Sequence, residues 1–554
     1  MALYIDGKKV AEREIPEFVL QSDSPFVLAA KDKEKYNVFD GALVRWRVAD
    51  SALESGFFEK GDAICDIDFS KFGEIPSDKT YFAVGGDFGD RPTDYAGCCD
   101  GLVTPDLRPS PEMTSVKKTH QNIHAKLLGF SEGVARIEIF NENFFVDLSK
   151  FKADWTLTRN GEEIASGSLP IAPTPPQGKS QAVANLSGVD FKKSGEYALR
   201  LSFKLAEDAY GFERGEETAW EQFELGGKFV PERDGKPLKV GPKEAVFQSG
   251  QQKAPLLSDD GKTITVSGEN FSVKFDKATG WLFDYTRKNT GWLSVFGLGE
   301  DVRLIKSPMK MNFWRPRTNN DRGAKLKLGE KLARWRAAPD RSKLTHFSAN
   351  EISDGIKVIS HYYNVECQLS VQTEYFVHPD GTIDVYARFV LEPTKKQTEV
   401  FRAGLQFAVN NNFDTREWYG LGPSETYVDT VRSAWLGKFK RGVDEMFFKF
   451  VDPQETSNVC GVRWANLSGG GLPKLKFTAL EGRNFEFGVY PYLPEDIEQA
   501  RSTAQLPERD FKIVNISAKN RGMGGVTSWR TNPVDGARIL SGQTYEMMFS
   551  ISAE

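Results

Sequence analysis

The alternation of apolar and polar residues over short segments is the feature that most constrains how this chain can fold. Between about residue 120 and residue 228 such segments recur, and the turn sequence Arg159–Gly161 separates two of them. A period of two residues predicts strands with one face on a core and one face in water. We therefore expect an immunoglobulin-like β-sandwich of about 100 residues at 120–228. Its strands are expected at Val134–Phe140, Asp154–Thr158, Gly195–Phe203 and Ala219–Leu225.

A second and larger region of strand-like segments covers residues 259–554. Its segments include Thr263–Ser267, Phe271–Phe275 and Thr544–Ile551. Helical patterns are short, at Gly329–Ala338 and at Pro494–Ala500, where a proline and acidic residues suit a helix start. So many strands and so few helices predict one large antiparallel sandwich. Residues 229–258, which are rich in proline and glycine, are expected to link the two regions.

The charge balance argues against a nucleic acid or a membrane as partner. The 554 residues include 72 Lys and Arg and 77 Asp and Glu, a net charge of −5, without a long run of either sign. No apolar run approaches the roughly 18 residues of a membrane span, and the N-terminus lacks the pattern of a secretory signal. The 5 cysteines show no spacing typical of disulfides or of a zinc site. We expect a cytoplasmic protein without a metal or a cofactor, whose ligand is neutral or small and polar.

Four ordered segments of the C-terminal region carry a resemblance to a known family. They are Asn312–Gly323, Trp418–Asp429, Val451–Asn458 with Val462–Trp464, and Gly522–Trp529. In this order they resemble the C-terminal small-chain domain of β-galactosidases of glycoside hydrolase family 2, which is a galactose-mutarotase-like supersandwich. Upstream, Gly85–Asp90, Asp94 and Gly101–Val103 resemble the segment that ends the catalytic barrel of that family.

The resemblance implies a mainly β fold in which a short barrel remnant precedes an immunoglobulin-like sandwich and an antiparallel supersandwich. Residues 1–119 are the least regular part of the chain, with one apolar-periodic segment at Phe39–Ala52. A complete (β/α)8 barrel takes roughly 250 residues. We therefore interpret 1–119 as a truncated barrel-like region.

The same resemblance bears on catalysis. Retaining glycosidases use two carboxylates about 5–5.5 Å apart, and members of this family carry both on barrel strands. Here Pro16–Gln21 resembles the nucleophile strand with Gln21 in the place of the nucleophile, and Arg45 follows a late-strand segment where a substrate-stacking tryptophan is usual. An amide cannot supply an anionic nucleophile. We therefore assign no catalytic residue, and we expect the isolated chain to be inactive.

Three residues are candidates for carbohydrate contact: Trp529, Asp94 and Asp100. In the family the tryptophan that corresponds to Trp529 reaches into the catalytic pocket and offers its flat face to the sugar; the alternative is a tryptophan in the sandwich core. The glycines at the start of Gly522–Trp529 permit a tight loop. Asp100 and the backbone of Gly97 stand where the family binds sodium, but an aspartate replaces the usual asparagine. We expect turn roles and no bound metal there.

Other motif residues are interpreted as structural. Arg315 and Asp321 are expected to form an internal ion pair that holds a long loop. Glu425 and Tyr427 are expected to be a buried carboxylate and phenol that pair with loop amides. His120 and His124 stand four residues apart on a predicted helix, but no third metal ligand lies nearby in the sequence.

The sequence alone leaves three alternative functions open. The first is the non-catalytic component of a split β-galactosidase, whose glutamates come from another chain. The second is a carbohydrate-binding or structural assembly protein that no longer turns over sugar. The third is a mutarotase-like site in the C-terminal sandwich, for which Glu425 is available but no histidine lies in a recognised motif. Under the first two, a partner chain or a second copy is expected to cover the face on which the barrel would pack.

Overall fold

The chain divides into two compact units. One comprises Met1–Pro109, Lys449–Pro453 and Ala500–Pro507, and the other comprises Ser110–Phe448, Gln454–Gln499 and Glu508–Glu554. The computed structural model describes residues 2–5, 8–12, 30–32, 35–37, 45–49, 63–68, 81–87, 89–99, 101–209, 211–233, 236–237, 253–288, 301–323, 328–353, 355–394, 398–527 and 531–554. Within these residues no helix has the length and hydropathy of a membrane span.

The described part of the first unit contains short antiparallel strand pairs and a turn-rich segment at residues 81–99. The pairs are β1 (Ala2–Ile5) with β2 (Lys8–Glu12), β3 (Ala30–Asp32) with β4 (Lys35–Asn37), and β5 (Arg45–Ala49) with β6 (Ala63–Asp68). The amide of Gly85 donates to the carbonyl of Tyr95 over 3.2 Å, just before the 3-10 helix η2 (Tyr95–Cys99). Gly86 has a φ of 90°, which a residue with a side chain rarely adopts.

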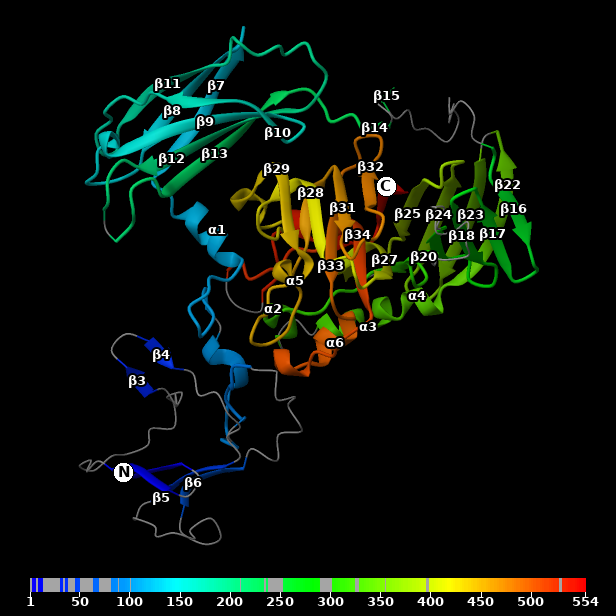
Figure 1. The fold of residues 1–554 in the computed structure, drawn as a ribbon, viewed down its shortest axis with the longest axis horizontal. Coiled ribbons are helices and arrows are strands. Elements are labelled where there is room, and N and C mark those ends of the chain that lie inside the picture. Colours follow the sequence, from blue (N-terminus) through cyan, green and yellow to red (C-terminus); the bar gives the residue numbers. More distant parts are fainter. Residues whose placement is uncertain are drawn as a thin grey trace. The chain divides into compact units, whose positions relative to one another are not determined.

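The immunoglobulin-like sandwich follows helix α1 (Glu112–Thr119) and has two antiparallel sheets (Figure 1). One sheet has the order β10-β9-β12-β13 and the other β11-β8-β7. The bounds are β7 Ile123–Ser131, β8 Val134–Asn141, β9 Phe151–Arg159, β10 Glu162–Leu169, β11 Lys179–Asn185, β12 Tyr197–Leu205 and β13 Glu217–Gly226. Every strand expected between 134 and 225 is present. The hydroxyl of Tyr197 donates 2.8 Å to the carbonyl of Lys193, as in the tyrosine corner of such sandwiches.

The C-terminal region is a sandwich of two large antiparallel sheets. The first has the path β16-β17-β18-β19-β20-β27-β34-β33-β30, with β21 also paired to β27. Its strands are β16 Leu256–Asp259, β17 Thr263–Ser267, β18 Phe271–Asp276, β19 Leu282–Arg287, β20 Val302–Ile305, β21 Lys310–Asn312, β27 Arg402–Asn410, β30 Val459–Val462, β33 Phe485–Tyr490 and β34 Phe511–Asn520.

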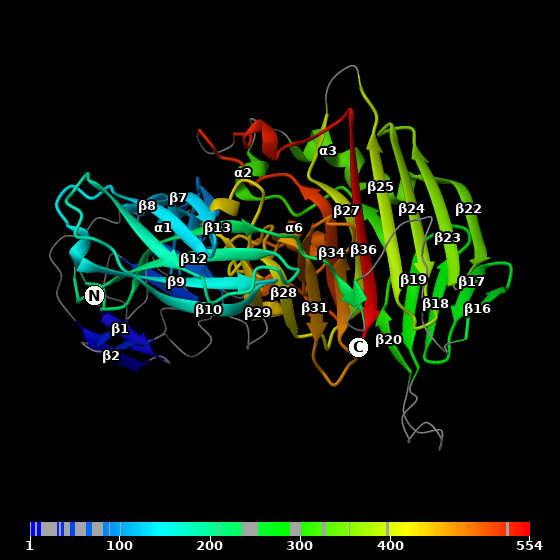
Figure 2. The ribbon, with the colours of Figure 1, turned by 90° about the horizontal axis from the view of Figure 1, so that it is seen from above.

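The second sheet has nine strands in the order β22-β23-β24-β25-β36-β32-β31-β28-β29. They are β22 Lys343–Ile352, β23 Gly355–Asn364, β24 Leu369–Val377, β25 Ile383–Leu391, β28 Thr415–Gly422, β29 Trp435–Gly442, β31 Trp464–Ser468, β32 Leu475–Ala479 and β36 Gln543–Ala553. The two sheets lie face to face (Figure 2). The prediction of a mainly β fold with two sandwiches is confirmed.

Short elements connect these strands. The helices are α2 Asn319–Arg322, α3 Leu328–Arg336, α4 Ala338–Arg341, α5 Val443–Met446 and α6 Pro494–Gln499. The helices expected at Gly329–Ala338 and Pro494–Ala500 correspond to α3 and α6. The 3-10 helices are η3 Leu148–Lys150, η5 Val431–Ser433, η6 Thr503–Gln505 and η7 Asp535–Ala537. Two further short pairs are β14 (Glu232–Arg233) with β15 (Lys236–Pro237), in the expected linker, and β26 (Glu399–Val400) with β35 (Ile539–Leu540).

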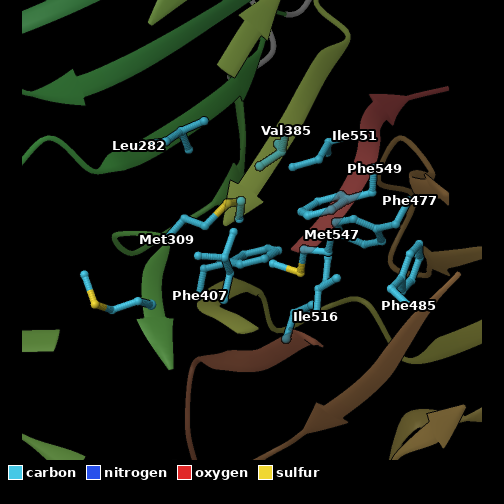
Figure 3. Packing of buried hydrophobic residues seen from close by; sticks show 14 of the residues in the cluster. Leu282, Met309, Val385, Phe407, Phe477, Phe485, Ile516, Met547, Phe549 and Ile551 are labelled. Atoms are coloured by element: carbon cyan, nitrogen blue, oxygen red, sulfur yellow. The ribbon is translucent and has the colours of Figure 1, made fainter. Parts of the chain in front are cut away.

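Side chains from both large sheets form one continuous core (Figure 3). Leu282, Phe407 and Ile516 come from the first sheet, and Val385 and Phe549 come from the second. All five are at most 1% exposed. Burial of each such side chain contributes about 1.5–3 kcal/mol relative to leaving it in water, so the core fixes the loops that leave the sheet edges.

Hydrogen bonds join the immunoglobulin-like sandwich to the nine-stranded sheet. Glu196 accepts 2.5 Å and 3.1 Å hydrogen bonds from the guanidinium of Arg463 and a 2.7 Å bond from the hydroxyl of Tyr419. The side-chain amide of Gln222 exchanges two hydrogen bonds with the backbone of Leu436, at 2.7 Å and 2.8 Å. These contacts give the Ser110–Glu554 part of the chain a defined inter-sandwich interface.

Candidate functional site

The loops that carry the sequence motifs meet at a buried cluster of charges. Arg315 Nη1 lies 2.6 Å from Asp321 Oδ2, and Arg521 Nη1 lies 3.1 Å from Asp321 Oδ1. The three side chains are fully buried. Burial alone would lower the pKa of Arg315, but the carboxylates of Asp321 and Glu455 outweigh it and the pKa is raised. The structure thus brings Arg315 and Asp321 together, and it adds Arg521.

Asp321 also caps the start of helix α2 as its third residue. Its Oδ2 accepts 3.0 Å hydrogen bonds from both the backbone amide and the hydroxyl of Thr318, which forms a capping box. The chain from Arg315 to Arg322 is therefore fixed by one carboxylate. Arg521 also forms an ion pair with Glu399, at 3.1 Å. Its charge is therefore compensated by two carboxylates, those of Asp321 and Glu399.

Two polar side chains anchor the loop that starts at Gly522. Asp429 accepts hydrogen bonds of 3.0 Å from the amides of both Met523 and Gly524. Asn320 Nδ2 donates to the carbonyl of Met523 at 3.0 Å and to that of Thr531 at 3.1 Å. Both ends of the segment that contains Trp529 are therefore tied to motif residues, while Trp529 itself lies outside the described residues.

A second cluster surrounds Glu425. Its Oε2 accepts a hydrogen bond of 2.6 Å from the amide of Ser457 and one from the hydroxyl of Thr456. Burial first, and the charge of Glu112 second, raise the pKa of Glu425 to about 8, although these hydrogen bonds oppose the shift. At neutral pH the protonated form therefore prevails. The carboxyl thus pairs with a loop amide, that of Ser457.

Arg416 holds the other side of Ser457. Its Nη1 donates to the carbonyl of Ser457 over 2.7 Å, and its guanidinium carbon lies 4.8 Å from the centre of the Trp418 ring. Burial lowers the pKa of Arg416 to about 9, against the opposing charge of Glu425. Ser457 has a φ of 78°, in the left-handed region, and such a residue persists only when its surroundings determine it. Two buried polar groups fix this turn.

Tyr427 pairs with a carboxylate rather than with a loop amide, which corrects the prediction. Its hydroxyl donates 3.1 Å to Glu455 Oε1, and that carboxylate also accepts 2.6 Å and 2.7 Å contacts from Tyr490 and 2.9 Å from Arg402 Nη2. Burial raises the pKa of Tyr427 well above its ordinary range. Because Glu455 lies on another loop, sequence spacing gave no signal for this partner.

The other predicted sugar contacts lie in the first unit or outside the described residues. Asp94 is exposed, and its carbonyl accepts a 3.0 Å hydrogen bond from the amide of Gly97, as in a turn. Asp100 and Gln21 lie outside the described residues. For Arg45 only the strand β5 is described.

The histidine prediction is wrong in one respect. Helix α1 ends at Thr119, and His124 stands on strand β7, where its Nε2 lies 2.6 Å from Glu142 Oε2. His120 and His124 therefore do not share a helix face. Throughout the described ranges there is no group of three or more His, Cys, Asp or Glu side chains that could hold a metal.

The buried carboxyl groups of these motif loops hold the loops in place, and none of them is free to act as a catalytic acid or nucleophile. Asp321 and Glu455 neutralise buried guanidinium groups, while burial and the charge of Glu112 keep Glu425 protonated against its hydrogen bonds. Sequence analysis singled out Glu425 but missed Asn320 and Asp429, although both stand inside the quoted motifs. Their position beside glycine-rich Gly522–Gly525 in space is set by tertiary packing alone.

Comparison with known proteins gives three family matches in chain order. Residues 68–125 match the family described as "Glycosyl hydrolases family 2, TIM barrel domain". Residues 137–226 match "Beta-galactosidase, domain 4", and residues 267–551 match "Beta galactosidase small chain".

Full-length relatives are similar across nearly the whole chain. A β-galactosidase of Halalkalibacterium halodurans is 29% identical over 525 residues, which are 94% of this chain and 46% of the relative. A β-galactosidase of Streptococcus thermophilus is 27% identical over 526 residues, 94% of this chain and 45% of the relative. The chain thus spans less than half the length of these curated relatives. Among solved structures, a galactose 1-epimerase of Lactobacillus acidophilus covers 55% of this chain and 99% of its own, with 10% identity and a TM-score of 0.32.

Proposed function

This chain belongs to the β-galactosidase small-chain family, and from that premise we propose that its 554 residues are the non-catalytic component of a β-galactosidase. The component supplies the end of the barrel, the immunoglobulin-like sandwich and the supersandwich. The two carboxylates that cleave the glycosidic bond come from barrel strands in polypeptide outside these residues. The reaction is hydrolysis of a terminal β-galactoside with retention of configuration.

The anchored loop at Gly522 is the observation that supports this role most directly. Asp429 and Asn320 tie both ends of the segment that contains Trp529, and the cluster of Arg315, Asp321 and Arg521 holds the anchors. A loop fixed at both ends presents its tip with little loss of entropy when a ligand binds. In this proposal the indole face of Trp529 packs against the apolar face of the sugar.

The carboxylates of the motif loops are unsuited to the chemical step, which supports the need for outside residues. A nucleophilic carboxylate must be free to bond the anomeric carbon. Glu455 and Asp321 are committed to guanidinium groups. Glu425 is protonated at neutral pH, and its Oε2 already accepts hydrogen bonds from Thr456 and Ser457.

Fragment complementation tests the proposal. The pure chain is mixed with the barrel-bearing N-terminal half of a relative such as the Halalkalibacterium halodurans enzyme, and hydrolysis of a chromogenic β-galactoside is recorded. We expect no turnover from either part alone and turnover from the mixture. Replacement of Trp529 by alanine should then raise KM and lower kcat. Substantial hydrolysis by the pure chain would overturn the proposal.

A variant that removes an anchor of the loop at Gly522 tests whether the position of this loop, and not only the Trp529 side chain, contributes to the rate. Asp429→Ala removes acceptors for two amides of the loop but leaves Trp529 in place, so it should lower kcat/KM about 10-fold in the complemented enzyme. Asp510→Ala is the matched control, because that side chain is 84% exposed. It should leave the rate unchanged.

A carbohydrate-binding or assembly role is the second candidate. It is favoured by the departures from the family pattern at Gln21, Arg45 and Asp100. Under this role the mixture would bind a β-galactoside without cleaving it. Under either role we propose that a partner chain or a second copy covers the face that a barrel would contact, and analytical ultracentrifugation with and without the barrel half tests that assembly. A cytoplasmic location completes the proposal, in line with the reduced thiols of Cys367 and Cys460.

A further inference from the structure

A row of polar side chains crosses the outer face of the nine-stranded sheet. In the strand register His346 stands opposite His361, His361 opposite Gln372, Gln372 opposite Arg388, and Arg388 opposite Glu546. The neighbouring positions on β23 to β25 point into the core, so this row faces away from it. Adjacent strands lie about 4.8 Å apart, so the row extends over roughly 19 Å.

A cavity of about 340 Å³ lies along this row, in the size range of small-molecule sites. The residues that line it belong to strands β22 to β25. These four strands are neighbours in the sheet (Figure 2). The polar lining residues are Thr345, His361, Tyr363, Ser370, Gln372 and Arg388.

The charged groups on this face compensate one another. Arg388 Nε lies 3.3 Å from Glu546 Oε1, and Arg483 Nη1 lies 2.6 Å from Glu546 Oε2. Beside them, Lys357 Nζ lies 2.6 Å from Glu374 Oε2. A charged ligand would have to compete with these pairs, so the cavity favours a neutral one.

The groups that remain for a ligand are neutral hydrogen-bonding groups and one ring. Nε2 of His361 is buried and has no hydrogen-bond partner among the described residues, which is costly unless a ligand or water reaches it. Gln372 donates its Nε2 to Glu374 over 2.6 Å, which leaves its carbonyl oxygen as an acceptor. Tyr363 is 40% exposed and offers an aromatic face.

We propose that this cavity is an accessory binding site for a neutral saccharide, sized for one hexose unit. Sugar hydroxyls both donate and accept hydrogen bonds, so they match His361, Ser370 and Gln372, while the C–H face of the ring packs on Tyr363. The site binds and does not cleave. It does not depend on the proposed β-galactosidase role, since no residue of the loop at Gly522 takes part.

The test is direct binding to the full chain without any barrel fragment. Saturation-transfer NMR and calorimetric titration with galactose, glucose and lactose should show saturable binding with a Kd in about the millimolar range. Tyr363→Ala and Gln372→Ala should each weaken it about 10-fold, with unchanged circular dichroism. Phe145→Ala is the matched control for stacking on an exposed ring, because Phe145 is 95% exposed in the immunoglobulin-like sandwich. It should leave the affinity unchanged.

Three results would overturn the inference. They are the absence of saturable binding for every sugar, equal affinity in the parent chain and both cavity variants, and preference for sulfate or phosphate over the sugars. Since no catalysis is measured, failure of fragment complementation leaves this inference standing, and loss of sugar binding here leaves the complementation result unaffected.

Discussion

Removal of the Asp321 carboxylate is the sharpest perturbation of the motif cluster. In Asp321→Ala the buried guanidinium of Arg315 loses its 2.6 Å partner, and Arg521 loses one of its two carboxylates. The remaining acceptors of Arg315 are the carbonyls of Pro316 at 3.2 Å and Gly522 at 3.5 Å. We therefore expect a large loss of stability that originates from a stranded buried charge.

The expected magnitude follows from these contacts. Removing one partner of a buried ion pair costs about 3–5 kcal/mol, because the charge of the other partner stays buried without compensation. Loss of the capping interaction with Thr318 adds about 1 kcal/mol. The free energy of unfolding of the supersandwich should therefore fall by about 4–6 kcal/mol. The double variant Asp321→Ala with Arg315→Met removes the stranded charge and should recover about 2 kcal/mol.

Urea unfolding followed by both tryptophan fluorescence and circular dichroism measures the change, with a two-state fit only where the transitions coincide. Asp510→Ala is the surface control, since its partner Lys306 lies 3.3 Å away on an open surface. It should change the stability by less than about 0.5 kcal/mol. A loss below about 1 kcal/mol in Asp321→Ala would refute the reasoning that the pair carries a buried charge.

Three further predictions concern the rest of the second compact unit. The pKa of Glu425 is raised to about 8 from an ordinary value of 4.5. The contribution of this group to the free energy of unfolding is therefore complete below pH 4.5 and is lost as the pH rises through about 8. Glu425→Gln should remove a pH dependence of up to about 1.4 kcal/mol per unit in that window, and parallel stability–pH curves for variant and parent would contradict it. Phe549→Ala should cost about 3–5 kcal/mol in urea unfolding, because the ring is fully buried between the sheets, and a loss under about 1 kcal/mol would disprove that packing. Glu196→Ala strands Arg463 at the inter-sandwich interface, so calorimetry should show the immunoglobulin-like sandwich melting separately; a single unchanged transition would argue against a coupled interface.

The alternation of residues predicts most of the fold because each strand has one face on a core. Within Val134–Phe140 the residues Ala135–Ile139 alternate, and Phe271–Phe275 alternates throughout. Both segments are strands with buried residues at every second position. Short helices were also predictable where proline or acidic residues mark a start, as at Pro494. A local pattern is enough to predict a strand or helix wherever the order of apolar and polar residues in the segment itself determines which face is buried.

The candidate site was only partly predictable, because its contacts join distant loops. Arg315 and Asp321 are six residues apart, and one loop brings them together. The partner of Tyr427 is Glu455, and the anchors of the loop at Gly522 are Asp429 and Asn320, which no spacing rule connects. His124 was placed on a helix because a period of four fits one, but the strand pairing of β7 prevails.

The central claim, that the glutamates of the reaction lie outside these residues, is tested most directly by covalent labelling. A 2-deoxy-2-fluoro β-galactoside traps the glycosyl-enzyme intermediate of a retaining enzyme, and peptide mass spectrometry then locates the modified residue. In the complemented enzyme the label should appear on the barrel half alone. A stoichiometric label on any residue of this chain would contradict the claim.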